Sequence, residues 1–220
     1  MKAKEVTIPT NWKEIKLKTF RAYQLMKEAK RKLSNLEEKM ITLELFCDLT
    51  AQEVRSLNIK DLNKLYEDLT KILSSDQAQF KFEQTFKFND KEFGFIPNLS
   101  KISTGEWADF EEFMKQGGYW KNVHKIMAIL WRPIKDQYKE KYSIEAYSDT
   151  HVSDHSEAFL DLGMDKVIGA QAFFLRLGTD LSMISLTSTT KRKLEKARAN
   201  LTDTITQSQK NTAGITRWLS

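Results

Sequence analysis

"FKFEQTFKFNDKEFGFIP", residues 80–97, is the stretch that decides the fold class, because the periodicity of the chain changes there. On each side of Asn89-Asp90 the phenylalanines lie an even number of residues apart, which puts them on one face of an extended chain. An Asn-Asp pair between two such runs is typical of a hairpin turn. Pro97 then ends the second run. The pattern predicts a β-hairpin whose aromatic face packs on helices.

The chain before this hairpin has helical periodicity. Apolar residues recur at helical spacing in three segments, which are residues 17–32, 35–48 and 59–74. Thr50, with Glu53 three residues later, has the spacing of a capping box and predicts a short helix between the second and third segments. We therefore expect a helical lobe over residues 1–76.

The chain after the hairpin returns to helical patterning. Ser103 or Thr104 is the predicted N-cap of a helix that ends at a pair of glycines. A second helix is expected over residues 119–131. It stops ahead of Pro133, because the residue before a proline disfavours helical backbone geometry.

The last third of the chain predicts one strand, further helix and an arm. The alternation in KYSIEAY, residues 141–147, predicts a strand that pairs with the hairpin. Ser153 is the expected N-cap of the next helix, which is clear from residue 156 onward. Residues 164–185 are expected to form a long, almost wholly apolar helix. Residues 191–220 are basic and then polar, with apolar residues near their tip, so we expect an arm.

These elements predict an α+β fold that is mostly helical. Its parts are an N-terminal helical lobe, a small antiparallel sheet of the hairpin plus one strand packed with helices, a long C-terminal helix and an extended arm. The predicted domains are residues 1–76, residues 77–190 as the α+β core, and residues 191–220 as the arm. We expect no membrane span and no signal peptide, since no long apolar run is present, and hence synthesis in the cytoplasm.

The net charge of +5 is distributed unevenly. Residues 1–33 carry ten Lys or Arg against three Glu, and residues 191–220 carry seven against two acids, whereas the middle is acidic. Basic ends suit contact with nucleic acid. Basic ends and an acidic middle equally suit contact between copies of the chain. Ordinary solvated helix faces would give the same composition.

Few residues suggest catalysis or metal binding. Cys47 lies in an apolar run, which favours a buried, inert thiol, and a single cysteine forms no internal disulfide. His151, Asp154 and His155 have a spacing that zinc can use, but no second His or Cys cluster completes a tetrahedral site. The sequence has no GxGxxG, P-loop, HExxH, CxxC or GxSxG pattern. We expect no catalytic residue, no metal and no cofactor, and therefore no enzyme.

The predicted helix after Ser103 gathers four carboxylates. They are Glu106, Asp109, Glu111 and Glu112. Such a group can serve acid–base chemistry or bind a hard cation, yet Glu106 also suits the positive end of the helix dipole. We interpret the acidic side as solvated or facing another subunit. Trp107 and Phe110 are expected to seat the helix on the sheet, and Gly105 to let it start close to its neighbours.

Four blocks of the sequence carry a family resemblance. They are IPTNWKEIKLKTFRAY from residue 8, GFIPNLSKISTGEWADFEEFMK from residue 94, YWKNVHKIMAILWRPI from residue 119 and KYSIEAY from residue 141. In content and order they resemble structural-module proteins of tailed bacteriophages, especially crAss-like and related phages of Bacteroidetes. That family shows FIPxLxxIxxGE(Y/W)xDxE, (L/M)AxL(Y/W)RPI and Y-x-I-E-x-Y. The likeness covers most of residues 8–147, and the C-terminal third matches only in being an apolar helix.

The resemblance implies a virion structural protein of the neck or tail, made in the host cytoplasm. It implies a multi-copy head–tail connector or ring that follows the symmetry of a portal, with about twelve copies. The implied partners are the chain itself, the portal or other neck and tail proteins, and packaged DNA in transient contact. No membrane is involved.

In a closed ring two different patches of each subunit must complement each other. We expect the acidic helix and the C-terminal arm to supply them. The residues predicted at this interface are Glu106, Asp109, Glu111, Glu112, Lys191, Arg192, Lys193, Arg217, Trp218 and Leu219. Two alternatives stay open: a tail-assembly chaperone that is absent from the mature virion, and a DNA-binding protein that uses the basic termini.

Overall fold

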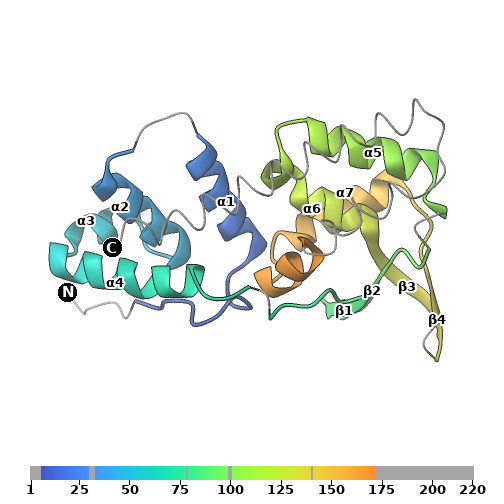
Figure 1. Ribbon diagram of the computed structural model, residues 1–220, viewed down its shortest axis with the longest axis horizontal. Helices are drawn as coiled ribbons and strands as arrows, with labels where there is room; N and C mark the ends of the chain where they lie inside the picture. Colours follow the sequence, from blue (N-terminus) through green and yellow to red (C-terminus); the bar gives the residue numbers. More distant parts are fainter. Residues whose placement is uncertain (1–5, 30–32, 78, 99–100, 140, 172–220) are drawn as a thin grey trace.

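Helices dominate the chain, and a small sheet lies in its second half (Figure 1). The computed structural model describes residues 6–29, 33–77, 79–98, 101–139 and 141–171. The first half contains α1 (Leu17–Glu28), α2 (Asn35–Phe46), α3 (Ala51–Ser56) and α4 (Ile59–Leu73). The second half contains β1 (Thr85–Phe88), β2 (Lys91–Phe95), α5 (Thr104–Lys115), α6 (Tyr119–Leu130), β3 (Trp131–Tyr138), β4 (Lys141–Ile144) and α7 (Asp149–Phe159), followed by helical residues 164–171. The predicted α+β, mostly helical class is confirmed.

Side-chain caps define the starts of the short N-terminal helices. The side chains of Ser34, Thr50 and Asn58 each accept a hydrogen bond from the backbone N–H three residues later. Thr50 and Glu53 form the capping box that the sequence predicted, with Glu53 accepting from the Thr50 backbone at 2.7 Å. Each cap satisfies donors that a helix start otherwise leaves unpaired.

The sheet has four antiparallel strands in the order β1-β2-β3-β4. Asn89 and Asp90 connect β1 to β2, and their φ angles of 47° and 59° are both left-handed. Two central residues with positive φ are the signature of a type I′ turn, whose twist matches that of the strands. The hairpin prediction is therefore confirmed, and Phe86 pairs with Phe93 across it.

Strand β3 was not predicted from the sequence, and its presence changes which strands pair. It lies between β2 and β4, so β4 pairs with β3 and not with the hairpin as expected. The miss has two causes: Pro133 argues against a central strand, and the outer half of β3 is exposed and polar. Pro133 supplies no backbone N–H, but its carbonyl still accepts from the backbone N–H of Glu145 at 3.0 Å.

Helix α7 begins earlier than predicted. It starts at Asp149, so Ser153 lies inside it and is not its N-cap. The helix ends at Phe159, and a second helical segment starts at residue 164, where the long apolar helix was expected. The predicted extension of that helix to residue 185 lies outside the described residues.

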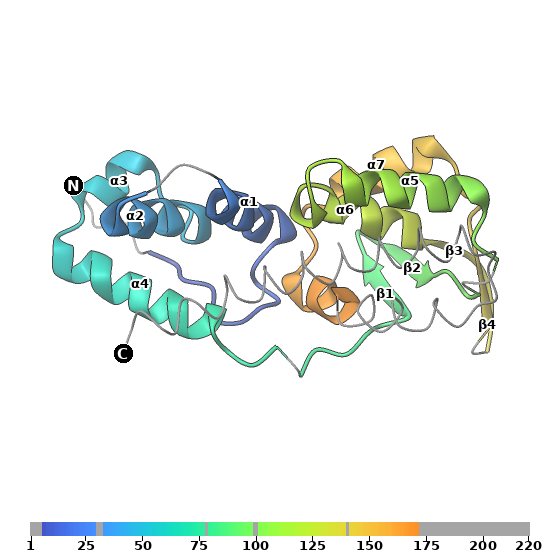
Figure 2. The ribbon, with the colours of Figure 1, turned by 45° about the horizontal axis from the view of Figure 1, so that its top comes forward.

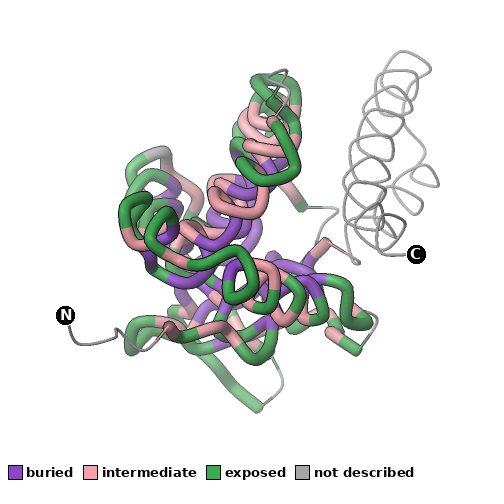
Figure 3. Tube along the Cα trace, turned by 90° about the vertical axis from the view of Figure 1, so that its left-hand side faces the viewer, coloured by how far each residue is buried: buried purple, intermediate pink, exposed green. Residues whose placement is uncertain are grey.

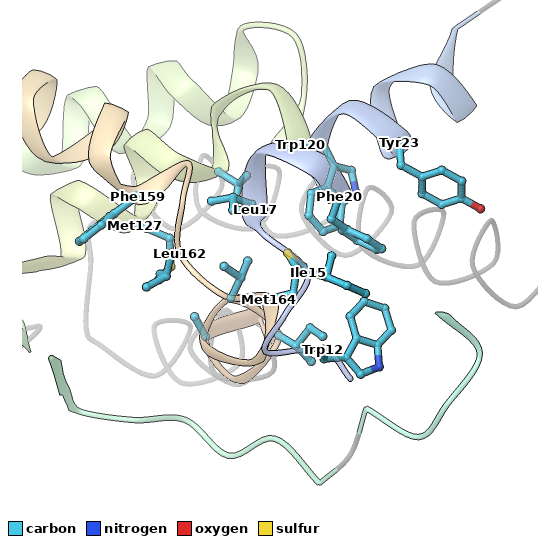
Figure 4. Packing of buried hydrophobic residues seen from close by; sticks show 14 of the residues in the cluster. Trp12, Ile15, Leu17, Phe20, Tyr23, Trp120, Met127, Phe159, Leu162 and Met164 are labelled. Atoms are coloured by element: carbon cyan, nitrogen blue, oxygen red, sulfur yellow. The ribbon is translucent and has the colours of Figure 1, made fainter. Parts of the chain in front are cut away.

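Residues on either side of the predicted boundary at residue 76 are joined through the core (Figure 4). The backbone of Leu17 donates to the Leu162 carbonyl at 2.8 Å, and that of Met164 donates to the Ile15 carbonyl at 2.9 Å. Within the first 76 residues, the Trp12 indole donates to the Ser75 hydroxyl at 3.0 Å. Figure 2 shows the connection from α4 to β1 crossing the molecule, and its described residues, 74–77 and 79–84, form neither helix nor strand. The N-terminal segment therefore packs on chain that follows it by about 150 residues.

Aromatic side chains fill the junction between α1 and α6. The Phe20 ring lies edge-on to Trp12, with centroids 5.4 Å apart, and edge-on to Trp120, with centroids 5.2 Å apart. Farther along, Phe159 of α7 packs against Phe93 of the sheet at 5.0 Å. Figure 3, which views the molecule from its left-hand side in Figure 1, shows buried residues toward the middle and exposed residues on the outer turns. Edge-to-face aromatic contacts stabilise such a core beyond the area that they bury.

Candidate functional site

A buried ion pair joins α5 to β3. Arg132 Nη2 lies 2.7 Å from Glu106 Oε1, and only 8% and 6% of the two side chains are exposed. The second carboxylate oxygen of Glu106 accepts from the Ser103 backbone N–H at 2.6 Å and completes the capping box of α5. Glu106 thus satisfies the start of its own helix and binds a strand at the same time. It fixes where α5 begins relative to the sheet.

A second polar contact lies beside this pair. The Tyr147 hydroxyl donates to the Asp109 carboxylate, which is one turn along α5 from Glu106. The Arg132 guanidinium carbon lies 5.9 Å from the centroid of the Tyr147 ring, within cation–π range. We call Glu106, Asp109, Arg132 and Tyr147 the α5–β3 cluster. It brings together residues that lie up to 41 positions apart.

The charges of the α5–β3 cluster fix the position of α5 relative to the sheet but add little net free energy to the fold. Burial lowers the pKa of Arg132 from its ordinary value, and the Glu106 carboxylate opposes that shift. The buried Nε of Arg132 has no hydrogen-bond partner within the described chain. Removing two charges from water costs about as much as their attraction returns. The cluster therefore sets the register between α5 and the sheet more than it adds free energy.

In the sheet next to the cluster, the Tyr142 ring lies directly against the backbone of Gly94. Gly94 pairs with Arg132 across β2 and β3. A Cβ on Gly94 would lie 2.5 Å from Tyr142 Cε2, so the tyrosine ring occupies the place of a side chain. The Tyr142 hydroxyl then donates to the Phe95 carbonyl at 2.8 Å. Only glycine permits this stacking.

The outer side of α5 carries two carboxylates. Lys115 Nζ lies 2.7 Å from Glu111 Oε1, and the Gln116 amide donates to Glu112 Oε1 at 2.7 Å. Both partners lie one turn along the same helix or at its end. The Lys115 side chain is 64% exposed, that of Glu111 is 27% exposed, and Glu112 is exposed. Pairs that are open to solvent on at least one side contribute little to stability. This side of α5 therefore remains accessible to another molecule.

The aromatic residues of α5 are not placed as predicted. Trp107 and Phe110 stack on each other with centroids 5.7 Å apart and remain half-buried. Helix α5 packs mainly against α6 (Figure 2), and it contacts the sheet through the pair between Glu106 and Arg132. The predicted need for close packing at Gly105 is also wrong, because the nearest atom to a Cβ there would be 3.8 Å away. The sheet face was unavailable to α5 because α7 and the aromatic residues of the sheet fill it.

The predicted interface residues fall into three groups. Glu106 is buried and bound inside the chain, so its assignment to an interface is corrected; Asp109 is half-buried and holds Tyr147. Glu111 and Glu112 lie on the outer side of α5. The remaining predicted residues lie outside the described residues; these are Lys191, Arg192, Lys193, Arg217, Trp218 and Leu219.

Sequence reasoning missed Arg132 and Tyr147. A signal for Arg132 was present, because it directly follows a continuous apolar run, IMAILW. A lone charge at the end of a buried run requires an opposite charge nearby. Nothing in the local sequence signalled Tyr147, whose partner lies 38 residues away.

The described residues hold no group of three His, Cys, Asp or Glu side chains that could bind a metal ion. Burial raises the pKa of the Cys47 thiol to about 11, so it is protonated at neutral pH and a poor nucleophile. The His155 ring packs edge-on against Phe93 at 5.3 Å. Within the part of the chain that the structure describes, no helix has the length and apolar character needed to cross a bilayer.

No family model, curated protein sequence or solved structure matches this chain. Its function is therefore argued from its own residues and from the motif resemblance.

Proposed function

We propose that this chain is a non-enzymatic structural protein of a tailed-phage virion, a multi-copy subunit of the neck or tail that assembles as a head–tail connector or ring. The expected partners are further copies of the chain and the portal or other neck and tail proteins.

One observation carries the proposal: the residues of the resemblance blocks bind one another. Glu106 of the block that starts at residue 94 pairs with Arg132 of the block that starts at residue 119, and Asp109 of the former holds Tyr147 of the block that starts at residue 141. In a catalytic site such carboxylates would face a substrate, whereas here they bind side chains of the same chain. A motif that builds a scaffold, with helix α5 displayed on it, supports a protein that works by contact.

The outer side of α5 is the proposed acidic half of the interface. Among the described residues, Glu111 and Glu112 are bound by residues of their own helix or its end, and a neighbouring subunit can compete for them. The complementary half is the basic segment of residues 191–220 of the next copy. In this arrangement each subunit uses two different patches, as a closed ring requires.

The test is the mass distribution of the purified chain by mass photometry, with negative-stain images of any large species. We expect a discrete ring near twelve copies, or one formed on adding the portal. Glu111→Gln with Glu112→Gln should shift the distribution toward monomers without changing the thermal midpoint. Glu67→Gln with Asp68→Asn is the matched control, because α4 there carries an exposed acid beside one that pairs with Lys71 at 2.7 Å.

Equal loss of assembly in both double variants would contradict the α5 interface. A clear fall in the thermal midpoint of Glu111→Gln with Glu112→Gln, alongside its loss of assembly, would also contradict the interface, because the two carboxylates would then stabilise the fold itself. Mass spectrometry of purified virions decides between the two phage roles: presence of the chain supports a virion component, and absence supports a tail-assembly chaperone.

A further inference from the structure

Three cationic residues lie where α1 meets α6. They are Arg21 of α1 and Lys121 and Lys125 of α6. Arg21 Nε donates to the Lys121 carbonyl at 3.1 Å, and Lys125 lies one helical turn after Lys121 on the same side. None of the three forms an ion pair with any residue that the structure describes. By contrast, Lys18 of α1 and Lys16, which directly precedes that helix, both form ion pairs with Asp161.

Neutral groups hold these cations in place. The Lys125 ammonium lies 5.0 Å from the centroid of the Phe113 ring. The Lys121 chain folds over Gly117, since a Cβ on that glycine would lie 2.5 Å from Lys121 Cδ. Arg21 is held by a backbone carbonyl. Each side chain is therefore ordered while its charge remains available to an external anion.

The first turn of α6 adds to the positive potential. Gly118 is its N-cap and offers no side chain, so no carboxylate or hydroxyl caps the helix. The preceding Gly117 has a φ of 85°, and Gly118 one of 84°, which places two glycines in left-handed geometry directly before the helix. The unpaired N–H groups and the dipole at a helix start favour negative charge.

Buried His124 lies in the positive potential of the same cations. It is 4% exposed, and its Nδ1 has no hydrogen-bond partner among the described residues. Burial, with smaller contributions from the charges of Arg21 and Lys125, lowers its pKa to about 4. The imidazole is therefore neutral at pH 7, and the positive charge at this junction comes from the three cations.

We propose that Arg21, Lys121 and Lys125 bind the phosphodiester backbone of double-stranded DNA. Like charges one turn apart on a helix are destabilising unless an anion lies between them. A single carboxylate neutralises one cation, whereas a DNA strand presents phosphates at regular short spacing and can neutralise all three. Contacts of this kind position a protein on DNA without reading its sequence.

This site goes beyond the proposed function and does not require it. DNA contact was expected only at the basic ends of the chain, whereas Lys121 and Lys125 belong to its acidic middle. A subunit of a conduit for packaged DNA would use such a site, and so would a protein with no place in a virion. The binding test below and the assembly test above therefore fail separately.

The experiment measures fluorescence anisotropy of a labelled DNA duplex with the full chain across a range of salt concentrations. Lys121→Gln with Lys125→Gln should reduce the slope of log K against log salt by about 1.8, because each phosphate contact contributes about 0.9. The matched control is Lys71→Gln with Lys115→Gln, which removes two charges that are already paired with carboxylates at 2.7 Å. It should leave the slope within about 0.3 of the unchanged chain.

Three results would overturn the proposal. They are no DNA binding by the unchanged chain, equal slopes for both double variants, and competition by poly-glutamate as effective as that by DNA at equal charge. The last result would assign the site to an acidic protein partner. If the double variant fails to fold, Lys125→Gln alone should reduce the slope by about 0.9.

Discussion

Breaking the pair between Glu106 and Arg132 is the most informative perturbation of the fold. Arg132→Met keeps the length and apolar stem of the side chain but leaves the Glu106 carboxylate, which is 6% exposed, without its cation. An uncompensated buried charge typically costs about 3–5 kcal/mol. A natural domain has about 5–15 kcal/mol in total, so the variant would lose a large fraction of its free energy of unfolding.

The assay is urea unfolding followed by tryptophan fluorescence. With a slope of about 3 kcal/mol per molar urea, the midpoint should fall by roughly 1–1.7 M. Glu106→Gln combined with Arg132→Met removes both charges, and Gln at that position can still cap the helix. The double variant should therefore recover at least half of the loss, which a double-mutant cycle measures as coupling.

The reasoning is refuted if Arg132→Met costs less than about 1 kcal/mol, or if the losses of the two single variants simply add. Lys115→Met is the matched control, because it breaks the pair with Glu111, in which the lysine is 64% exposed. An exposed pair of this spacing should cost at most about 0.5 kcal/mol.

Two glycines of helical segments should respond oppositely to alanine: Gly169→Ala should destabilise, because its Cβ would lie 2.4 Å from the Lys81 carbonyl oxygen, whereas Gly105→Ala should be neutral or stabilise by up to about 1 kcal/mol. Thermal unfolding of both variants checks this, and a stabilised Gly169→Ala would show that the contact yields easily. Stability should also fall as pH drops from about 6.5 toward 4, because the folded-state pKa of His124 is lowered to about 4 and protonation favours the unfolded chain. At pH 5 this group should cost about 2 kcal/mol relative to pH 7.5, and His124→Gln should remove that part of the pH dependence.

Local signals in the sequence were sufficient for most helices and for the hairpin. Helices α2, α3 and α4 each announce their start by a capping residue followed by a helical period, and both signals act within a few residues. The Asn89-Asp90 turn is equally local, since its two left-handed residues decide the hairpin by themselves. These elements could be predicted because the atoms that stabilise them are neighbours in the chain.

The candidate site depended on contacts that the sequence does not announce. The acidic side of α5 was predicted, but its division into an inward and an outward part was not, because only the tertiary fold brings Arg132 to Glu106 and Tyr147 to Asp109. The same holds for the three cations at the junction of α1 and α6, where Arg21 meets a residue 100 positions later.

Periodicity and capping, read from the sequence, determined which residues become helix or hairpin, since those choices depend on local backbone geometry and hydrogen bonds. The tertiary structure alone decided that β3 separates the hairpin from β4 and that Glu106 points inward. Strand order and the pairing of buried charges depend on desolvation and on packing between distant segments. These effects produce no periodic pattern of residues in the sequence.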